Sequence, residues 1–172
     1  MSEILKIGDS RLRNQAQKIL EPTEAEIIEL AQNLIATAEQ ANGVGIAAPQ
    51  IGQSWRVFIV ASRPSIRYPH APQMSPTAMI NPVLLSHGDE VVKDWEGCLS
   101  VPDVRALVPR YREIEVAYTD IEGKQQYRVL QDFVARIFQH ELDHINGVLF
   151  PDRVVSTEDL YTEAEYQKLI FS

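Results

Sequence analysis

The segment His140-Glu141-Leu142-Asp143-His144 constrains this chain more than any other feature. Residues four positions apart lie on one face of an α-helix, a turn away from each other, so both imidazole rings can reach a single metal ion. Glu141 stands between the histidines in the sequence and can approach a water molecule at that metal without ligating it. The surrounding residues 133–145 follow a helical pattern, with Asp132 expected to cap its start and Gly147 to close its end.

A structural role for the two histidines is the alternative. The helix carries a separate apolar stripe, formed by Val134, Phe138, Leu142 and Ile145. The histidines stand beside this stripe, at a semi-buried margin where two polar rings need partners. A shared metal ion supplies those partners, and this favours the metal interpretation over two packed or solvated histidines.

Two histidines leave a catalytic metal site one protein ligand short. Some zinc proteases add a third histidine further along the chain, at the position that Phe150 occupies here, so that class is excluded. Others add a downstream glutamate, for which Glu163 and Glu165 are the candidates. The remaining candidate is Cys98, whose thiolate is a strong soft ligand for zinc or ferrous iron. From the residues alone, Cys98 and Glu163 are comparable candidates.

Two further interpretations of these residues remain open. Cys98 could be the nucleophile of a Cys–His hydrolase. Alternatively, the metal could stabilise a binding protein that has no catalytic activity. An intramolecular disulfide is excluded, because the chain contains one cysteine.

Length and composition favour one domain spanning residues 1–172, with 45% hydrophobic residues to build its core. The formal net charge of −8 and the pI of about 5.0 argue against a dedicated nucleic-acid surface, which needs clustered lysine and arginine. No segment approaches the run of about 20 apolar residues that a membrane span requires. The N-terminus lacks the basic start and apolar core of a signal peptide.

The pattern along the chain favours an α+β fold. Residues 23–42 have the apolar spacing of a helix. Residues 56–61 are expected to form a buried strand and 79–85 an edge strand, because Pro82 cannot donate to a sheet ladder. Further extended segments are expected at 104–108, 114–118 and 125–130, the last two joined as a hairpin by the turn 120–123, and a short helix after Ser156.

Three segments together resemble the three sequence motifs of the peptide deformylase family. They are residues 43–52 (GVGIAAPQIG), 96–100 (EGCLS) and 139–144 (QHELDH), in the family's order and with similar spacing. The resemblance covers nearly the whole chain, although Asp132 stands where many members have glycine just before the helix. It implies a fold of mixed, mostly antiparallel β-sheets packed around the central HExxH helix, with an N-terminal helix on the outside.

The resemblance implies a hydrolase that removes the formyl group from N-formylmethionine at the start of new polypeptides and releases formate. Cys98, His140 and His144 would then be the metal ligands. Ferrous iron is the favoured metal, with zinc, nickel and cobalt as alternatives. The expected partners are nascent N-formylmethionyl peptides and, transiently, the ribosome, with no membrane and no nucleic-acid partner. We expect a monomer in the cytoplasm, or in an organelle if a presequence has been removed.

Further roles follow from the same resemblance. Glu141 would take a proton from the attacking water and pass it to the leaving amine. The backbone N–H of Leu99 and the side-chain amide of Gln50 would stabilise the oxyanion, and Gly45 would contact the substrate backbone. The candidates for the methionine pocket are Val44, Phe133 and Ile137, for which core packing is the alternative.

Overall fold

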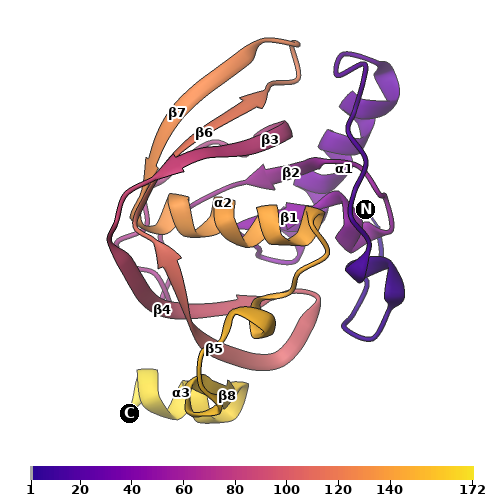
Figure 1. Cartoon of the computed structure of the whole chain (residues 1–172). Coiled ribbons are helices and arrows are strands. Elements are labelled where there is room, and N and C mark those ends of the chain that lie inside the picture. The colour runs from indigo at the N-terminus through magenta and orange to yellow at the C-terminus, as the bar shows by residue number, and fades with distance from the viewer. Residues whose placement is uncertain (1) are drawn as a thin grey trace.

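Two antiparallel sheets form the framework of the computed structural model, which describes residues 2–172. The larger sheet has the strand order β1-β2-β3-β6-β7 and the smaller one β4-β5-β8. The strands are β1 Gly45–Ala47, β2 Val57–Val60, β3 Thr77–His87, β4 Val91–Cys98, β5 Val101–Tyr111, β6 Glu113–Thr119, β7 Gln125–Gln131 and β8 Leu160–Thr162. Figure 1 shows the helix α2 (Asp132–Ile145) running between the two sheets.

Helices complete the described part of the chain. The helix α1 (Ala25–Gln40) lies on the outside, against β1 and β2, and α3 (Glu163–Phe171) lies against β5 and β8 (Figure 1). The short 3-10 helices are η1 Ser10–Arg13, η2 Ala48–Ile51, η3 Phe150–Arg153 and η4 Thr157–Asp159. A central α2 and an outer α1 confirm the α+β arrangement expected from the sequence. Across residues 2–172, no helix has the length and apolar character needed to cross a membrane.

Strand β2 separates two layers of the core. All four of its residues are buried. Phe58 faces α2, where its ring meets Phe138 edge-on with 5.2 Å between the ring centroids. Val57 and Ile59 face the opposite side and pack beneath α1. A strand covered on both faces is a continuous apolar run, and burial of each of these large side chains contributes roughly 1.5–3 kcal/mol.

Strand β3 differs from the edge strand expected at residues 79–85. It pairs with β2 on one side and with β6 on the other, so that expectation was wrong. The register between β3 and β6 shifts between Ile80 and Val83, and this bulge takes Pro82 out of the ladder. Asn81, inside the bulge, has a left-handed backbone with φ of 49°. A proline is therefore tolerated within a central strand.

The other extended segments are largely as expected. The hairpin around residues 120–123 is the antiparallel pair β6–β7. Residues 104–108 belong to the longer strand β5, which pairs with β4 and with the short β8. Strand β4 was not expected, because its first residues are exposed and show no alternation. This strand matters for the site, since it ends at Cys98.

The start of α2 also differs from the expectation. Asp132 is the first residue of the helix, and Gln131 occupies the N-cap position without a side-chain hydrogen bond. The backbone of Asp132 has φ of 52°, and its carboxylate pairs with Arg112 at 3.0 Å. Glycine is the residue best suited to this left-handed conformation, and aspartate is among the few others that adopt it. The departure from the family pattern at this position is therefore conservative in backbone terms.

Candidate active site

Cys98, His140 and His144 converge on one point. The two histidines come from successive turns of α2, and Cys98 ends β4 just before the turn into β5. Cys98 Sγ lies 3.2 Å from His144 Nε2. One ligand atom from each of the three residues lies within 4.8 Å of the other two. The fold thus brings together two neighbouring imidazoles and a thiol from a distant strand.

The chemistry of this donor set fits a divalent metal ion. One thiolate and two imidazoles suit zinc, iron, cobalt or nickel, and three protein ligands leave a further coordination position open. Burial lowers the pKa of His144 well below its usual value, so this ring is neutral and able to ligate. Burial alone would lower the pKa of His140 too, but hydrogen bonding to Cys98 and Glu96 raises it well above its usual value. Glu96 and Cys98 therefore favour a positive charge at His140, whereas His144 stays neutral.

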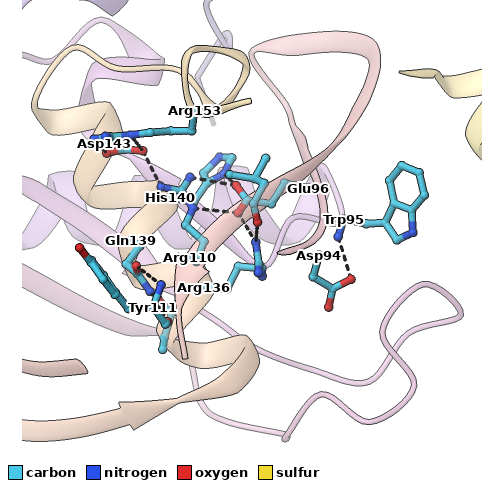
Figure 2. Close-up of polar contacts among 12 residues, drawn as sticks. Asp94, Trp95, Glu96, Arg110, Tyr111, Arg136, Gln139, His140, Asp143 and Arg153 are labelled. Carbon is cyan, nitrogen blue, oxygen red and sulfur yellow. Dashed lines mark hydrogen bonds and ion pairs between the residues drawn. The ribbon is translucent and has the colours of Figure 1, made fainter. Parts of the chain in front are cut away.

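The buried carboxylate of Glu96 orients His140 (Figure 2). Its Oε1 accepts a hydrogen bond from His140 Nδ1 at 2.8 Å, which leaves Nε2 of the ring available for a metal. Arg110 donates to both oxygens of Glu96, at 2.9 and 3.0 Å, and Arg136 donates to Oε2 at 2.7 Å. Burial alone would raise the pKa of Glu96, but His140 and Arg110 hold it well below its usual value. Such carboxylates fix the tautomer and orientation of metal-binding histidines.

The network continues along α2 to Asp143 (Figure 2). Arg110 donates to Asp143 Oδ2 at 2.7 Å, and Arg153 donates to Oδ1 at 2.8 Å. Asp143 and Arg110 are both 6% exposed. Buried charges are tolerated when they are paired and hydrogen-bonded, and both conditions are met here. Asp143 thus supports the helix that carries the histidines.

Glu141 lines a cavity beside the three candidate ligands and is not part of their cluster. Its side chain is buried, and its Oε2 has no hydrogen-bond partner among residues 2–172. Burial raises the pKa of Glu141 to about 7. A carboxyl group with such a pKa can accept and return a proton near neutral pH. Gly45 gives it room, because a Cβ at that position would lie 2.6 Å from Glu141 Oε1.

Gln50 is held with its amide nitrogen toward Cys98. Its Oε1 accepts a hydrogen bond from the backbone N–H of Ala47 at 2.9 Å, which fixes the orientation of the amide. Its Nε2 lies 3.1 Å from Ser100 Oγ and 3.6 Å from Cys98 Sγ. Leu99, between Cys98 and Ser100 in the sequence, lines the same cavity as Glu141. The groups predicted to stabilise an oxyanion are therefore next to the thiol.

The cavity has a volume of about 700 Å³. Such a volume is within the usual range for sites that bind small molecules or peptides. Phe133 and Ile137 are one turn apart on α2, and Ile137 is one turn before Glu141, so the three share a face of the helix. The four residues predicted to contact a substrate all line the cavity, namely Val44, Gly45, Phe133 and Ile137.

Several residues of the cavity were not foreseen from the sequence. Tyr68 comes from the proline-rich loop between β2 and β3, where no periodicity marks it. Glu163, on α3, pairs with Arg105 Nε at 2.6 Å and with Arg67 at 2.7 Å. Its carboxylate therefore contacts guanidinium groups and lies outside the metal cluster. Glu165 caps the start of α3, so neither glutamate is placed as the third ligand.

Comparison with known proteins adds independent findings. The family model described as polypeptide deformylase matches residues 1–159. Peptide deformylase 2 of Nostoc sp. is 58% identical over 167 residues, which cover 97% of this chain and 93% of that protein. The Met-Ala-Ser-bound crystal structure of class I type b peptide deformylase from Acinetobacter baumannii has a TM-score of 0.87 at 43% identity, covering 90% of this chain and 98% of that chain. Peptide deformylase from Thermotoga maritima has a TM-score of 0.81 at 34% identity, covering 91% and 99%.

Proposed function

This chain belongs to the polypeptide deformylase family, and on that premise we propose how its own residues carry out the family's reaction. It is a metal-dependent hydrolase that removes the N-formyl group from nascent polypeptides. The observation that carries the assignment of residues is the convergence of Cys98, His140 and His144 beside Glu141, at a cavity large enough for a peptide end.

We propose that Cys98 Sγ and the imidazole nitrogens of His140 and His144 hold one divalent cation. When bound, such a cation supplies Lewis acidity, which lowers the pKa of water and polarises a carbonyl oxygen. The mixed sulfur and nitrogen donors suit iron, zinc, nickel and cobalt. Ferrous iron is the ion we favour, on the strength of the family resemblance. Glu96 keeps the His140 ring in place by accepting its Nδ1 proton.

Glu141 is the proposed general acid and base. Its unpaired Oε2 is free to accept a proton from the attacking water and to deliver it to the leaving amine. Burial, which raises its pKa to about 7, matches it to both halves of that transfer near neutral pH. Gly45 keeps the space beside Glu141 open for the substrate.

The amide of Gln50 and the backbone N–H of Leu99 are the proposed donors to the oxyanion that develops on the formyl oxygen. The hydrogen bond from Ala47 directs the Gln50 nitrogen toward Cys98, where the formyl group must lie. Donors fixed in advance stabilise a developing charge without having to reorganise. Loss of one such donor typically lowers the rate by about 100- to 1,000-fold.

The substrate cavity fits an N-formylmethionyl peptide. Val44, Phe133 and Ile137 supply apolar surface for the methionine side chain, and Gly45 supplies backbone contact. We also propose that the chain acts as a single-domain monomer. It would act in the bacterial-type cytoplasm, or in an organelle, and contact the ribosome transiently.

A direct test is formate release from formyl-Met-Ala-Ser by protein reconstituted without oxygen with iron, zinc, nickel or cobalt. Cys98→Ala should reduce the bound metal, and Glu163→Ala, which removes the rival ligand, should leave the metal content unchanged. Glu141→Ala should retain the metal and lose formate release. Formate release that is insensitive to Glu141→Ala would refute the proposed role of this residue.

A further inference from the structure

Tyr68 lines the substrate cavity and makes two specific contacts there. Its ring stacks on Phe133, with 4.3 Å between the ring centroids and 30° between the planes. Its hydroxyl donates a hydrogen bond to the backbone carbonyl of Trp95 at 2.9 Å. These contacts tie the loop between β2 and β3 to both α2 and β4.

A second cavity of about 380 Å³ lies behind this aromatic pair. Tyr68 and Phe133 line the substrate cavity and the second cavity alike. Arg67, Trp95 and Arg136 border both spaces as well. Among these five residues, Tyr68 and Phe133 form the stacked pair, which is the aromatic part of the partition. Apolar residues on the far side of the partition include Pro69, Ala71 and Val92.

The arginines of the second cavity are already paired with carboxylates, and Asp94 accepts a hydrogen bond from the backbone N–H of Trp95. Arg112 contacts Glu90 at 2.9 Å and Asp132 at 3.0 Å. Arg110 is held by Glu96 and Asp143, as described above. The space is therefore better suited to an apolar or aromatic group than to a free charge.

Helix α2 relates the aromatic pair to Glu141. Phe133, Ile137 and Glu141 follow one another on the same face of α2. Eight residues of helix separate Phe133 from Glu141, a rise of about 12 Å. A substrate with its formyl group beside Glu141 can direct its first side chain past Ile137, toward the aromatic pair.

The C-terminal segment supports the partition from outside. Arg67, which precedes Tyr68, pairs with Glu163 at 2.7 Å. Trp95, which accepts the hydrogen bond of Tyr68, meets the rings of Tyr161 and Tyr166 edge-on at 4.9 and 4.8 Å. The supporting residues of this segment lie beyond the residues 1–159 that the family model matches.

We propose that the Tyr68–Phe133 pair is the end wall of the first-residue pocket and sets the largest first side chain that the enzyme accepts. This inference rests on the function proposed above. When the wall is opened, the second cavity receives the excess of a bulky aromatic side chain. Tyr68 is thus a specificity-determining residue for the reaction.

The test compares kcat/KM for formyl-Met-Ala-Ser and formyl-Phe-Ala-Ser. The unmodified enzyme should favour methionine, and Tyr68→Ala should raise the ratio of phenylalanine to methionine by about tenfold or more, since one misfitting carbon group in an apolar pocket is worth at least that much. Tyr68→Phe, which retains the stacked ring, should keep the original ratio. Tyr127→Ala, at an exposed tyrosine of β7, is the matched control and should change neither value.

Phe133→Ala opens the same wall from α2 and should shift the ratio of phenylalanine to methionine in the same direction. This second variant keeps the test possible if Tyr68→Ala does not fold. Calorimetric binding of the products Met-Ala-Ser and Phe-Ala-Ser reports on the wall without turnover. Absence of formate release by the unmodified enzyme would therefore reject the proposed function alone. If both kcat/KM values fall together and the binding ratio of the products does not change, the wall has a structural role only and the proposal is overturned.

Discussion

Replacement of Glu96 by glutamine tests how strongly a buried carboxylate governs the proposed metal centre. Glu96 is 4% exposed and accepts hydrogen bonds from three cationic or potentially cationic side chains, those of His140, Arg110 and Arg136. Glutamine has a similar shape, but one of its two terminal atoms is a donor. The amide N–H group of the glutamine must face the N–H group of His140, Arg110 or Arg136. The negative charge between the two guanidinium groups is also lost.

The expected cost follows from burial. Removal of one partner from a buried ion pair typically destabilises a protein by about 3–5 kcal/mol, because a charge is left uncompensated. At about 2–4 °C per kcal/mol for a chain of this size, Tm should fall by roughly 10 °C. Loss of the carboxylate that orients a histidine typically weakens metal binding by about 10- to 100-fold. Both changes are expected in Glu96→Gln.

The pH dependence has a defined sign. The pKa of Glu96 is lowered in the folded protein by His140 and Arg110. Its stabilising contribution is therefore fully present above the pKa of a glutamate in the unfolded chain, about 4.3. That contribution is lost as the pH falls through the lower pKa of the folded state. The difference in stability between the unmodified chain and Glu96→Gln should be full at neutral pH and shrink only in acid.

Urea denaturation, together with competition between the protein and a chelator for the metal, measures both effects. Glu90→Gln is the matched control, because Glu90 pairs with Arg112 at the surface, where both side chains are more than half exposed. This control should change little, since exposed pairs contribute little to stability. If Glu96→Gln and Glu90→Gln behave alike in stability and in metal affinity, the argument from burial is refuted.

Three other outcomes are expected. Gly45→Ala places a methyl group 2.6 Å from Glu141 Oε1 and 2.9 Å from Ile137, so formate release should fall by about 100-fold. Unchanged kinetics in a variant with full metal content would contradict this tight contact. Burial raises the pKa of Glu141 to about 7, and a bound cation lowers it from there. We therefore expect kcat/KM to decline as the pH falls from neutral and Glu141 becomes protonated. A kcat/KM profile that stays level into acid would count against Glu141 as the general base. Aerobic storage should inactivate the iron-loaded protein, through oxidation of the metal and of Cys98, faster than the zinc-loaded protein, and equal half-lives would argue against that route.

The parts of the fold that could be predicted from the sequence are those set by local spacing. His140 and His144 share a face of α2 because of the helical repeat, and the β6–β7 hairpin follows from alternation around a turn. The tolerance of Pro82 inside β3 depends on a bulge against β6, which only the pairing of distant strands reveals. The position of Tyr68 likewise depends on contacts of an aperiodic loop with α2 and β4.

The third ligand shows the same limit. Cys98 reaches His144 across 46 positions of the chain, and nothing in the local spacing separates it from Glu163. The resemblance to a family favoured the cysteine, and the structure supplies the physical reason. Glu163 is held by Arg67 and Arg105, whereas Cys98 is carried to α2 by the end of β4.

The buried polar residues of α2 connect the stability of the fold with its chemistry. A helix between two sheets would ordinarily present apolar side chains, yet five of its buried residues are polar or charged: Arg136, Gln139, Glu141, Asp143 and His144. Arg136, Gln139 and Asp143 have hydrogen-bond partners that offset the cost of burial. Across residues 2–172, two of the three buried side-chain atoms that lack a partner are Glu141 Oε2 and His144 Nδ1. An unpaired buried polar group destabilises a fold. Glu141 Oε2 lies at the substrate cavity, where a bound water or substrate would supply its missing partner.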